Sequence, residues 1–369
     1  MAALPGARLD ESLGVKVVRF QDQVILSKQI THLGRPWKQY KKRIQIPKAW
    51  LPVHADSCRR GLTPRFVGVY HHDRTTIFVD FETTNYAARE VNNSSAHLAT
   101  NDLFQAQTLG QFSRLDKNDN RITSIRFDAF EAYLRFGYEE RNDHLSAIDR
   151  FTTHLLDGTR IDGLTAVQEM HASGWPDSFQ NEWQGFYLEF RLSEFLSQQG
   201  MQSQLAVQKE KGRSSFDYDL RFIEGGRTAH YGDLKASDIT AKESPGNDAA
   251  RFHRCLHEYG KFWYVIYEHH TWHSRDNGDV ATVAWNEWRR SVGHVGRNST
   301  FNPLSYAGKF KEAVLFQRVK VLEVNQSNVG VVLKEFQKGF KQPDGSLRKA
   351  KVSIQKQDIE NFLIYSKSL

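Results

Sequence analysis

Cysteine is scarce in this chain, because its 369 residues include only Cys58 and Cys255. Two distant cysteines exclude a disulfide framework and a zinc site built from cysteine pairs. The sequence also lacks an apolar run near 18 residues and a signal-peptide pattern, so we expect an intracellular, cytoplasmic protein that does not contact a membrane. A glycine-rich phosphate loop of the GxxxxGK(S/T) type is missing as well, which argues against a nucleotide cofactor.

Negative charge is in the minority. Lys and Arg number 50 against 43 Asp and Glu, which gives a formal charge of +7 at pH 7 and a pI near 9.2. A moderate basic excess favours a polyanionic partner. A chain of this length normally contains two or three domains and buries a sizeable core.

The segment between Val24 and Ala55 contains no acidic residue, yet it is rich in lysine and arginine and includes Trp37 and Tyr40. Cationic side chains neutralise phosphates, and interleaved aromatic rings stack on bases or wedge between them. A solvated basic loop would have the same composition. We favour a surface that contacts double-stranded DNA, and the residues that we expect to bind are Arg35, Lys38, Lys41, Lys42 and Arg43.

Residues 1–160 have the pattern of a separate, mainly β domain. Short runs rich in β-branched and aromatic residues alternate with turn residues, which is typical of strands. These runs cover residues 15–20, 23–27, 43–47, 65–70 and 75–81. Since this domain contains no evident catalytic group, we expect it to recognise DNA.

The most informative segment is residues 214–237. Two strand-like runs, SSFDYDLRF and YGDLKAS, flank the turn-like IEGGRTAH. Side chains alternate between the faces of a strand, so Asp233 and Lys235 point the same way while Leu234 points into the core. If the two runs pair, Asp219 joins them. Two carboxylates and an ammonium are what metal-assisted phosphodiester cleavage requires, although the wet face of an ordinary sheet has the same pattern.

The flanking residues predict a defined series of elements around this hairpin. Apolar positions at helical spacing predict a helix over residues 181–199 that stops at Gly200. Residues 205–208 predict a strand and residues 248–259 a second helix. The apolar aromatic run FWYVIY, residues 262–267, is typical of a central strand.

In this order the elements resemble the PD-(D/E)XK, or restriction-endonuclease-like, nuclease superfamily over residues 165–290. The resemblance implies an α/β (α+β) core, with a central mixed sheet flanked by helices, in a catalytic domain spanning residues 161–300. It also implies roles for single residues. Asp219 and Asp233 would bind Mg2+ with the Leu234 carbonyl as a third ligand, Lys235 would orient the attacking water, and Glu189 would support the metal shell.

Two of these assignments have competitors in the sequence. Asp217 lies on the same strand face as Asp219, so alternation does not separate them. Glu182 is the alternative to Glu189 on the preceding helix.

Residues 301–369 are expected to form a C-terminal extension packed on the catalytic domain. The apolar pattern predicts a strand over residues 313–324, a helix over residues 329–340 and a final helical segment that ends at residues 362–365. The Pro-Asp-Gly sequence within residues 342–345 predicts a turn.

Together these features predict a Mg2+-dependent DNA endonuclease that cuts duplex DNA at a specific site. It would be most like a bacterial type II restriction enzyme, the nuclease of a restriction-modification system, acting as a homodimer. A modification-dependent, repair or mobile-element nuclease of the same superfamily is one alternative. A DNA-binding protein without catalysis is the other.

Overall fold

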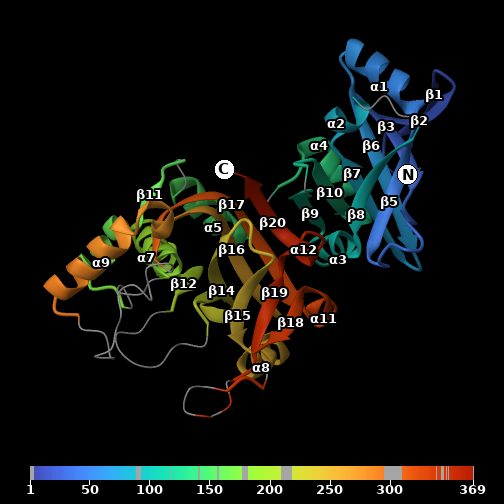
Figure 1. Cartoon of the computed structure of the whole chain (residues 1–369). Helices are drawn as coiled ribbons and strands as arrows, with labels where there is room; N and C mark the ends of the chain where they lie inside the picture. Colours follow the sequence, from blue (N-terminus) through green and yellow to red (C-terminus); the bar gives the residue numbers. More distant parts are fainter. Residues whose placement is uncertain are drawn as a thin grey trace. The chain divides into compact units, whose positions relative to one another are not determined.

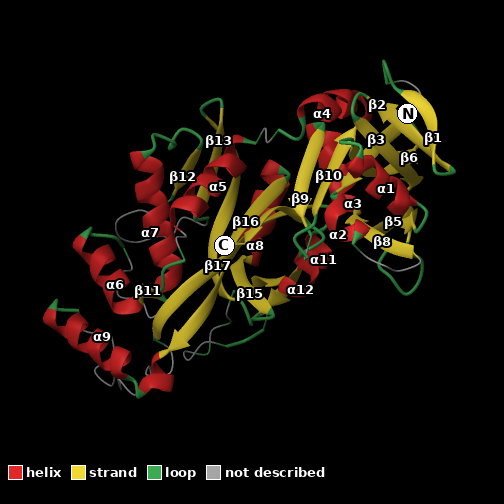
Figure 2. Cartoon of the chain, turned by 90° about the horizontal axis from the view of Figure 1, so that it is seen from above, coloured by secondary structure: helices red, strands yellow, loops and turns green. Residues whose placement is uncertain are grey.

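The computed structural model describes residues 4–88, 93–116, 118–139, 142–155, 158–176, 182–208, 218–294, 310–337, 339–341, 345, 347 and 349–368. The chain divides into two compact units. Unit 1 comprises Met1–Arg141 and Glu360–Ile364, and unit 2 comprises Asn142–Ile359 and Tyr365–Leu369. Both units contain helices and sheets, so the protein is a mixed α/β structure, as the colours of Figure 2 show.

Unit 1 is built around a seven-stranded sheet with the order β1-β2-β3-β6-β7-β10-β9. Its strands are β1 (Arg8–Ser12), β2 (Val15–Phe20), β3 (Gln23–Gln29), β6 (Thr63–His72), β7 (Thr75–Phe81), β9 (Gln111–Leu115) and β10 (Arg121–Arg126). A three-stranded sheet contains β4 (Thr31–His32), β5 (Lys41–Pro47) and β8 (Asn93–Ala99). The five predicted strand segments of this region all lie in strands, so these predictions are confirmed.

One parallel pair interrupts the antiparallel pattern of the larger sheet. Strand β3 runs parallel to β6, whereas the other pairs in this sheet are antiparallel. Parallel neighbours need a long crossover connection, and here it contains β4, β5 and helix α1 (Trp50–Arg59). The basic segment therefore lies in this crossover.

Helices cover the apolar side chains of unit 1. They are α2 (Thr83–Ala87), α3 (Thr100–Leu109) and α4 (Phe130–Phe136), the last preceded by the 3-10 turn η1 (Phe127–Ala129). Phe130 stacks on Phe78 with ring centroids 4.1 Å apart, within a core that includes Val18, Ile25 and Ile125. Burial of such side chains supplies most of the driving force for folding.

Unit 2 contains a second seven-stranded sheet, with the order β11-β17-β16-β14-β13-β12 and β20 paired with β17. Figure 1 shows β14, β16 and β17 near the middle of this unit. The strands are β11 (Ile161–Asp162), β12 (Leu205–Val207), β13 (Leu220–Glu224), β14 (Arg227–Asp238), β16 (Lys261–His273), β17 (Lys311–Asn325) and β20 (Leu363–Ser368). Strands β14 and β16 are parallel, while the other pairs along the path are antiparallel, so the sheet is mixed.

The remaining elements of unit 2 flank this sheet. The helices and 3-10 turn are α5 (Asp143–Leu155), α6 (Gly163–Ala172), α7 (Trp183–Gln198), α8 (Ala249–Tyr259), η2 (Ser274–Asn277) and α9 (Val280–Ser291). A small sheet of β15 (Glu243–Asp248), β19 (Lys351–Gln355) and β18 (Leu333–Phe336) follows, together with the short helices α11 (Val329–Val332) and α12 (Lys356–Ile359).

Local sequence explains why α8 forms between β14 and β16. The Asp248 side chain accepts a hydrogen bond from the Arg251 amide at 3.1 Å and so caps the helix at its start. Gly260 ends the helix in the left-handed conformation, with φ +73°, which glycine adopts without steric cost. The helix lies within the crossover that a parallel β14–β16 pair requires.

Two predictions for the C-terminal region are wrong. The segment predicted as one helix over residues 329–340 forms the four-residue α11 and then strand β18, and the predicted final helix is strand β20. Short apolar segments of this kind are compatible with the periodicity of a helix and with that of a strand. Here β18 pairs with β19 and β20 pairs with β17, and this pairing makes both segments strands. The predicted strand over residues 313–324 is confirmed as β17. Most of the predicted turn at residues 342–345 lies outside the described residues.

The compact units differ from the division by sequence at three places, one of which is the assignment of Glu360–Ile364 to unit 1. Helix α5 belongs to unit 2, although it precedes residue 160, and β17 is an inner strand of the unit 2 sheet that pairs with β16 over its length. Among the described residues, no helix is long and apolar enough to cross a membrane.

A buried histidine provides a test of the unit 2 core. The ring of His230 stacks on Phe222 at 4.4 Å and lies 4.7 Å from Trp263. Neither ring nitrogen has a hydrogen-bond partner among the described residues, and burial lowers the pKa of His230 to about 2. An unsatisfied buried polar group costs about 1–3 kcal/mol.

We therefore expect His230→Phe to raise the free energy of unfolding at pH 7. The unfolded histidine binds a proton below about pH 6.5, whereas the folded one stays neutral. Parental stability therefore falls between pH 6.5 and pH 2, and the advantage of the variant grows as the pH falls. Urea unfolding at pH 7.5 and pH 5 measures both effects, with the exposed His270→Phe as control. A variant less stable than the parent would contradict this account.

Candidate functional site

The β13–β14 hairpin brings the acidic residues of the central motif together. Gly225 and Gly226 form its turn with φ of +54° and +77°, and Leu220 pairs with Gly232. Asp219 immediately precedes β13, so the register places it beside Asp233 on β14. The expected pairing of the two runs is confirmed from Leu220 onward. Asp217 lies outside the described residues.

Asp233 and Lys235 share one face of β14, as the alternation of side chains predicts. Asp233 is 1% exposed, and Lys235 Nζ lies 2.5 Å from Asp233 Oδ2. Leu234, between them, is buried in the core. Asp233 Oδ2 is held by the Lys235 ammonium as an ion pair, although it accepts no hydrogen bond of normal geometry among the described residues.

Asp219 contacts the backbone of the same strand. The Leu234 amide donates a hydrogen bond to Asp219 Oδ2 at 3.3 Å. In an extended strand the N–H and C=O of one residue point to the same edge. The Leu234 carbonyl therefore faces the edge at which Asp219 lies, so Asp219, Asp233 and this carbonyl supply oxygen atoms from one small region.

The electrostatics of the cluster follow from its burial and its excess of carboxylates. Burial and the neighbouring Asp219 carboxylate raise the pKa of Asp233 well above its usual range, and only Lys235 opposes them. Burial alone would lower the pKa of Lys235, but the carboxylates of Asp233, Asp219 and Glu189 raise it. One ammonium faces three acids, so the cluster favours a further cation.

Helix α7 contributes Glu189 and not Glu182 to this region. Glu189 is 6% exposed and interacts electrostatically with Lys235. Glu182 is the exposed residue that precedes α7, about two helical turns away, and its charge acts on Lys311 instead. The structure thus brings Asp219, Asp233, Lys235 and Glu189 together.

The donor set fits a hard divalent cation that keeps part of its water shell. Among the described residues, no three His, Cys, Asp or Glu side chains form a group that could hold a metal ion alone. Mg2+ does not need such a cage, because it is usually bound by one or two carboxylates together with water and substrate phosphates. Two aspartates and a backbone carbonyl match this mode.

Sequence reasoning missed two neighbours of the acidic pair. Tyr264 lies opposite Asp233 in the β14–β16 ladder, and its hydroxyl donates to Asn247 Oδ1 at 3.0 Å. Gly232 allows this close pairing, because a Cβ there would lie 2.6 Å from the Trp263 carbonyl oxygen. The sequence around Tyr264 predicts only a buried strand. Its position opposite Asp233 depends on the parallel register of β14 and β16, which the sequence does not show.

The basic segment of unit 1 is divided between a loop and a strand. Arg35 and Lys38 are exposed in the β4–β5 loop, and Lys41 is half-buried at the start of β5. Lys42 is only 5% exposed, its Nζ lies 5.8 Å from the Tyr70 ring centroid, and burial lowers its pKa. Arg43 is half-buried in β5. Of the predicted DNA-binding residues, the structure exposes the loop members and buries Lys42.

Comparison with known proteins gives one similarity, which lies in unit 1. A family model described as Methylase-associated X1 matches residues 21–134. No curated protein matches the chain, and no solved structure matches it. The similarity therefore covers the basic loop and the strands β3 to β10 of unit 1, leaves out β1 and β2, and stops before the acidic cluster of unit 2.

Proposed function

We propose that the chain is a Mg2+-dependent DNA endonuclease of a restriction-modification system, most like a type II restriction enzyme. The observation that carries the proposal is the cluster of Asp219, Asp233, Lys235 and Glu189 at the open end of the β13–β14 hairpin. The order α7-β12-β13-β14-α8-β16, with β14 parallel to β16, supports a PD-(D/E)XK core, although the added strand β15 stands between β14 and α8.

Each residue of the cluster has a distinct chemical task. Asp219, Asp233 and the Leu234 carbonyl would hold Mg2+, which when bound supplies positive charge to the scissile phosphate. Lys235 donates hydrogen bonds to the attacking water or to the phosphate oxygens, where negative charge develops. Glu189, which adds to the effect of Asp233 and Asp219 on the pKa of Lys235, would support the metal shell. Hydrolysis leaves a 5′-phosphate and a 3′-hydroxyl, as the family resemblance implies.

Unit 1 would provide the contact with double-stranded DNA. Its similarity to a methylase-associated family supports a place in a system that also contains a DNA methylase. Exposed cations in the β4–β5 loop suit a phosphate backbone. The described residues contain one acidic cluster of this kind, so cutting both strands of a duplex takes either two copies or two sequential nicks, and we propose a homodimer.

The methylase-associated similarity also favours a second candidate of the same chemistry, a modification-dependent nuclease. The two candidates differ in the DNA that unit 1 recognises. Parallel digestion of methylated and unmethylated phage DNA separates them, because a conventional restriction enzyme cuts the unmethylated form and a modification-dependent enzyme cuts the methylated form.

The first prediction concerns Lys235. We expect Lys235→Met to lower the rate of plasmid cleavage by about 10²–10⁴-fold, because the variant loses the group that positions water and stabilises charge. DNA binding in EDTA should stay close to that of the parent. Conversion of supercoiled plasmid to nicked and linear forms measures cleavage, and EDTA should abolish it in the parent.

A thermal unfolding curve shows whether Lys235→Met remains folded, and Lys16→Met, at an exposed position outside the basic segment, is its matched control. Cleavage by the Lys235 variant at the parental rate would contradict the assignment. A parent that binds DNA but cuts none with Mg2+ would favour a DNA-binding protein without catalysis.

The second prediction uses the two glutamates of α7 as a matched pair. We expect Glu189→Gln to slow cleavage about 10–100-fold, because residues that orient groups around a metal commonly have effects of this size. Glu182→Gln should cut at the parental rate, since Glu182 is exposed and its side chain makes no capping hydrogen bond. Initial nicking rates over a Mg2+ series measure both, and equal effects of the two substitutions would overturn the role of Glu189.

A further inference from the structure

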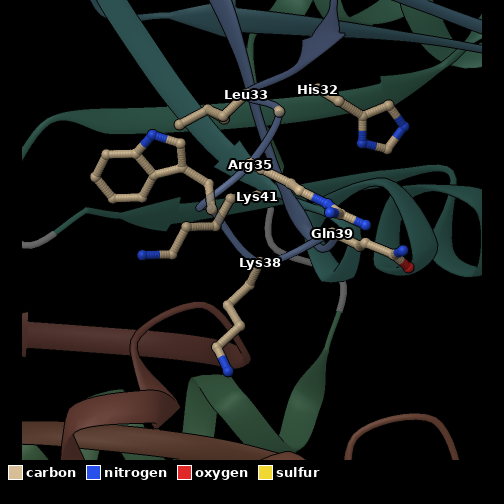
Figure 3. A pocket seen from close by; sticks show the side chains of 8 residues that line it. His32, Leu33, Arg35, Lys38, Gln39 and Lys41 are labelled. Atoms are coloured by element: carbon tan, nitrogen blue, oxygen red, sulfur yellow. The ribbon is translucent and has the colours of Figure 1, made fainter.

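The loop between β4 and β5 encloses a pocket of about 440 Å³ in unit 1. Figure 3 shows side chains from both halves of this loop projecting around it, including Leu33, Arg35, Lys38 and Gln39. The volume lies within the usual range for small-molecule sites. The pocket is remote in sequence from the acidic cluster, and the proposed function gives this loop the phosphate backbone of DNA but assigns no base to the pocket.

Two consecutive turns shape the pocket. The Trp37 amide donates to the Gly34 carbonyl at 3.0 Å, and the Lys41 amide donates to the Lys38 carbonyl at 3.0 Å. Gly34 has φ +79°, a conformation that favours glycine. These backbone hydrogen bonds therefore define the course of the loop.

The exposed ring of Trp37, called here the aromatic platform, lies among these side chains. Trp37 is 55% exposed, which is unusual for so large an apolar side chain. Lys41 Nζ lies 5.4 Å from the centroid of its ring, a cation–π distance. An indole that is open to solvent and has a cation beside it suits a flat, electron-rich ring with a phosphate nearby.

The charges around the platform are of one sign. In the part of the chain that the structure describes, no acidic side chain pairs with Arg35, Lys38 or Lys41. Gln39 adds an amide that both donates and accepts hydrogen bonds. A ring for stacking, cations for phosphates and an amide for the edge of a base are the parts of a nucleotide site.

We propose that this pocket receives one unstacked nucleobase of DNA, stacked on Trp37, with its flanking phosphates on Arg35 and Lys38. The inference rests on the DNA-binding part of the proposed function and is independent of catalysis. The base would come either from a single strand or from a duplex in which it rotates out of the helix, at a cost of a few kcal/mol. A surface that binds only the backbone would not need the exposed indole.

The test uses oligonucleotides that carry 2-aminopurine, a fluorescent base that is quenched when it stacks. The full chain in EDTA is titrated with a labelled single strand, a matched duplex, and a duplex with the label opposite an abasic site. We expect the parent to quench the single strand and the abasic duplex. In the matched duplex the label starts stacked and quenched. A change in its fluorescence on protein binding would show that the protein extracts a paired base, and an unchanged fluorescence would show that the pocket binds only unpaired bases.

Variants of the loop separate stacking from charge. Trp37→Ala should lose the quenching and bind the single strand roughly tenfold more weakly, whereas Trp37→Phe should retain most of both, because a phenyl ring also stacks. Lys38→Ala should keep the quenching and reduce the slope of log affinity against log salt by about 0.7, the effect of one phosphate contact on a single strand. Phe136→Ala, which removes an aromatic ring that is 85% exposed outside the pocket, should match the parent.

The outcomes distinguish the inference from the function on which it rests. If the parent binds DNA and Trp37→Ala keeps the parental affinity and quenching, the nucleobase pocket is wrong while the endonuclease proposal stands. If the parent binds none of the three DNAs, the DNA-binding part of the proposed function fails with it.

Discussion

The buried contact between Lys235 and Asp233 is the interaction on which the account of this protein depends. A carboxylate that is 1% exposed, beside a second carboxylate, would be costly without a positive partner. Lys235 supplies one, with its Nζ 2.5 Å from Asp233 Oδ2. The fold keeps these charges together by pairing β14 with β13 on one side and with β16 on the other.

The sheet explains why this arrangement is specific to one place in the chain. Strand β14 continues beyond the end of its ladder with β13, so Asp219 and the Leu234 backbone meet where the two strands separate. On the other edge, Gly232 permits the close approach of Trp263. Unit 1 carries an exposed, cationic loop instead, so under the proposed function unit 1 would contact DNA and unit 2 would cleave it.

Sequence alone predicted those features that depend on local periodicity. Alternation placed Asp233 and Lys235 on one face, and helical spacing with Gly200 located α7 and its buried Glu189. Features that depend on partners distant in sequence were missed. Strands β18 and β20 exist because β19 and β17 pair with them, and Lys42 is buried because Ile44 and Ile46 turn the same face of β5 into the core.

The most direct test of the central claim is a titration with Mn2+ followed by electron paramagnetic resonance, which detects free Mn2+ as protein is added. The parent should bind Mn2+ at one strong site from which Mg2+ displaces it, and Asp219→Asn should lose that site while it remains folded. Equal Mn2+ binding by the parent and the variant, or no binding by the parent, would contradict the claim that Asp219 and Asp233 form a divalent-cation site.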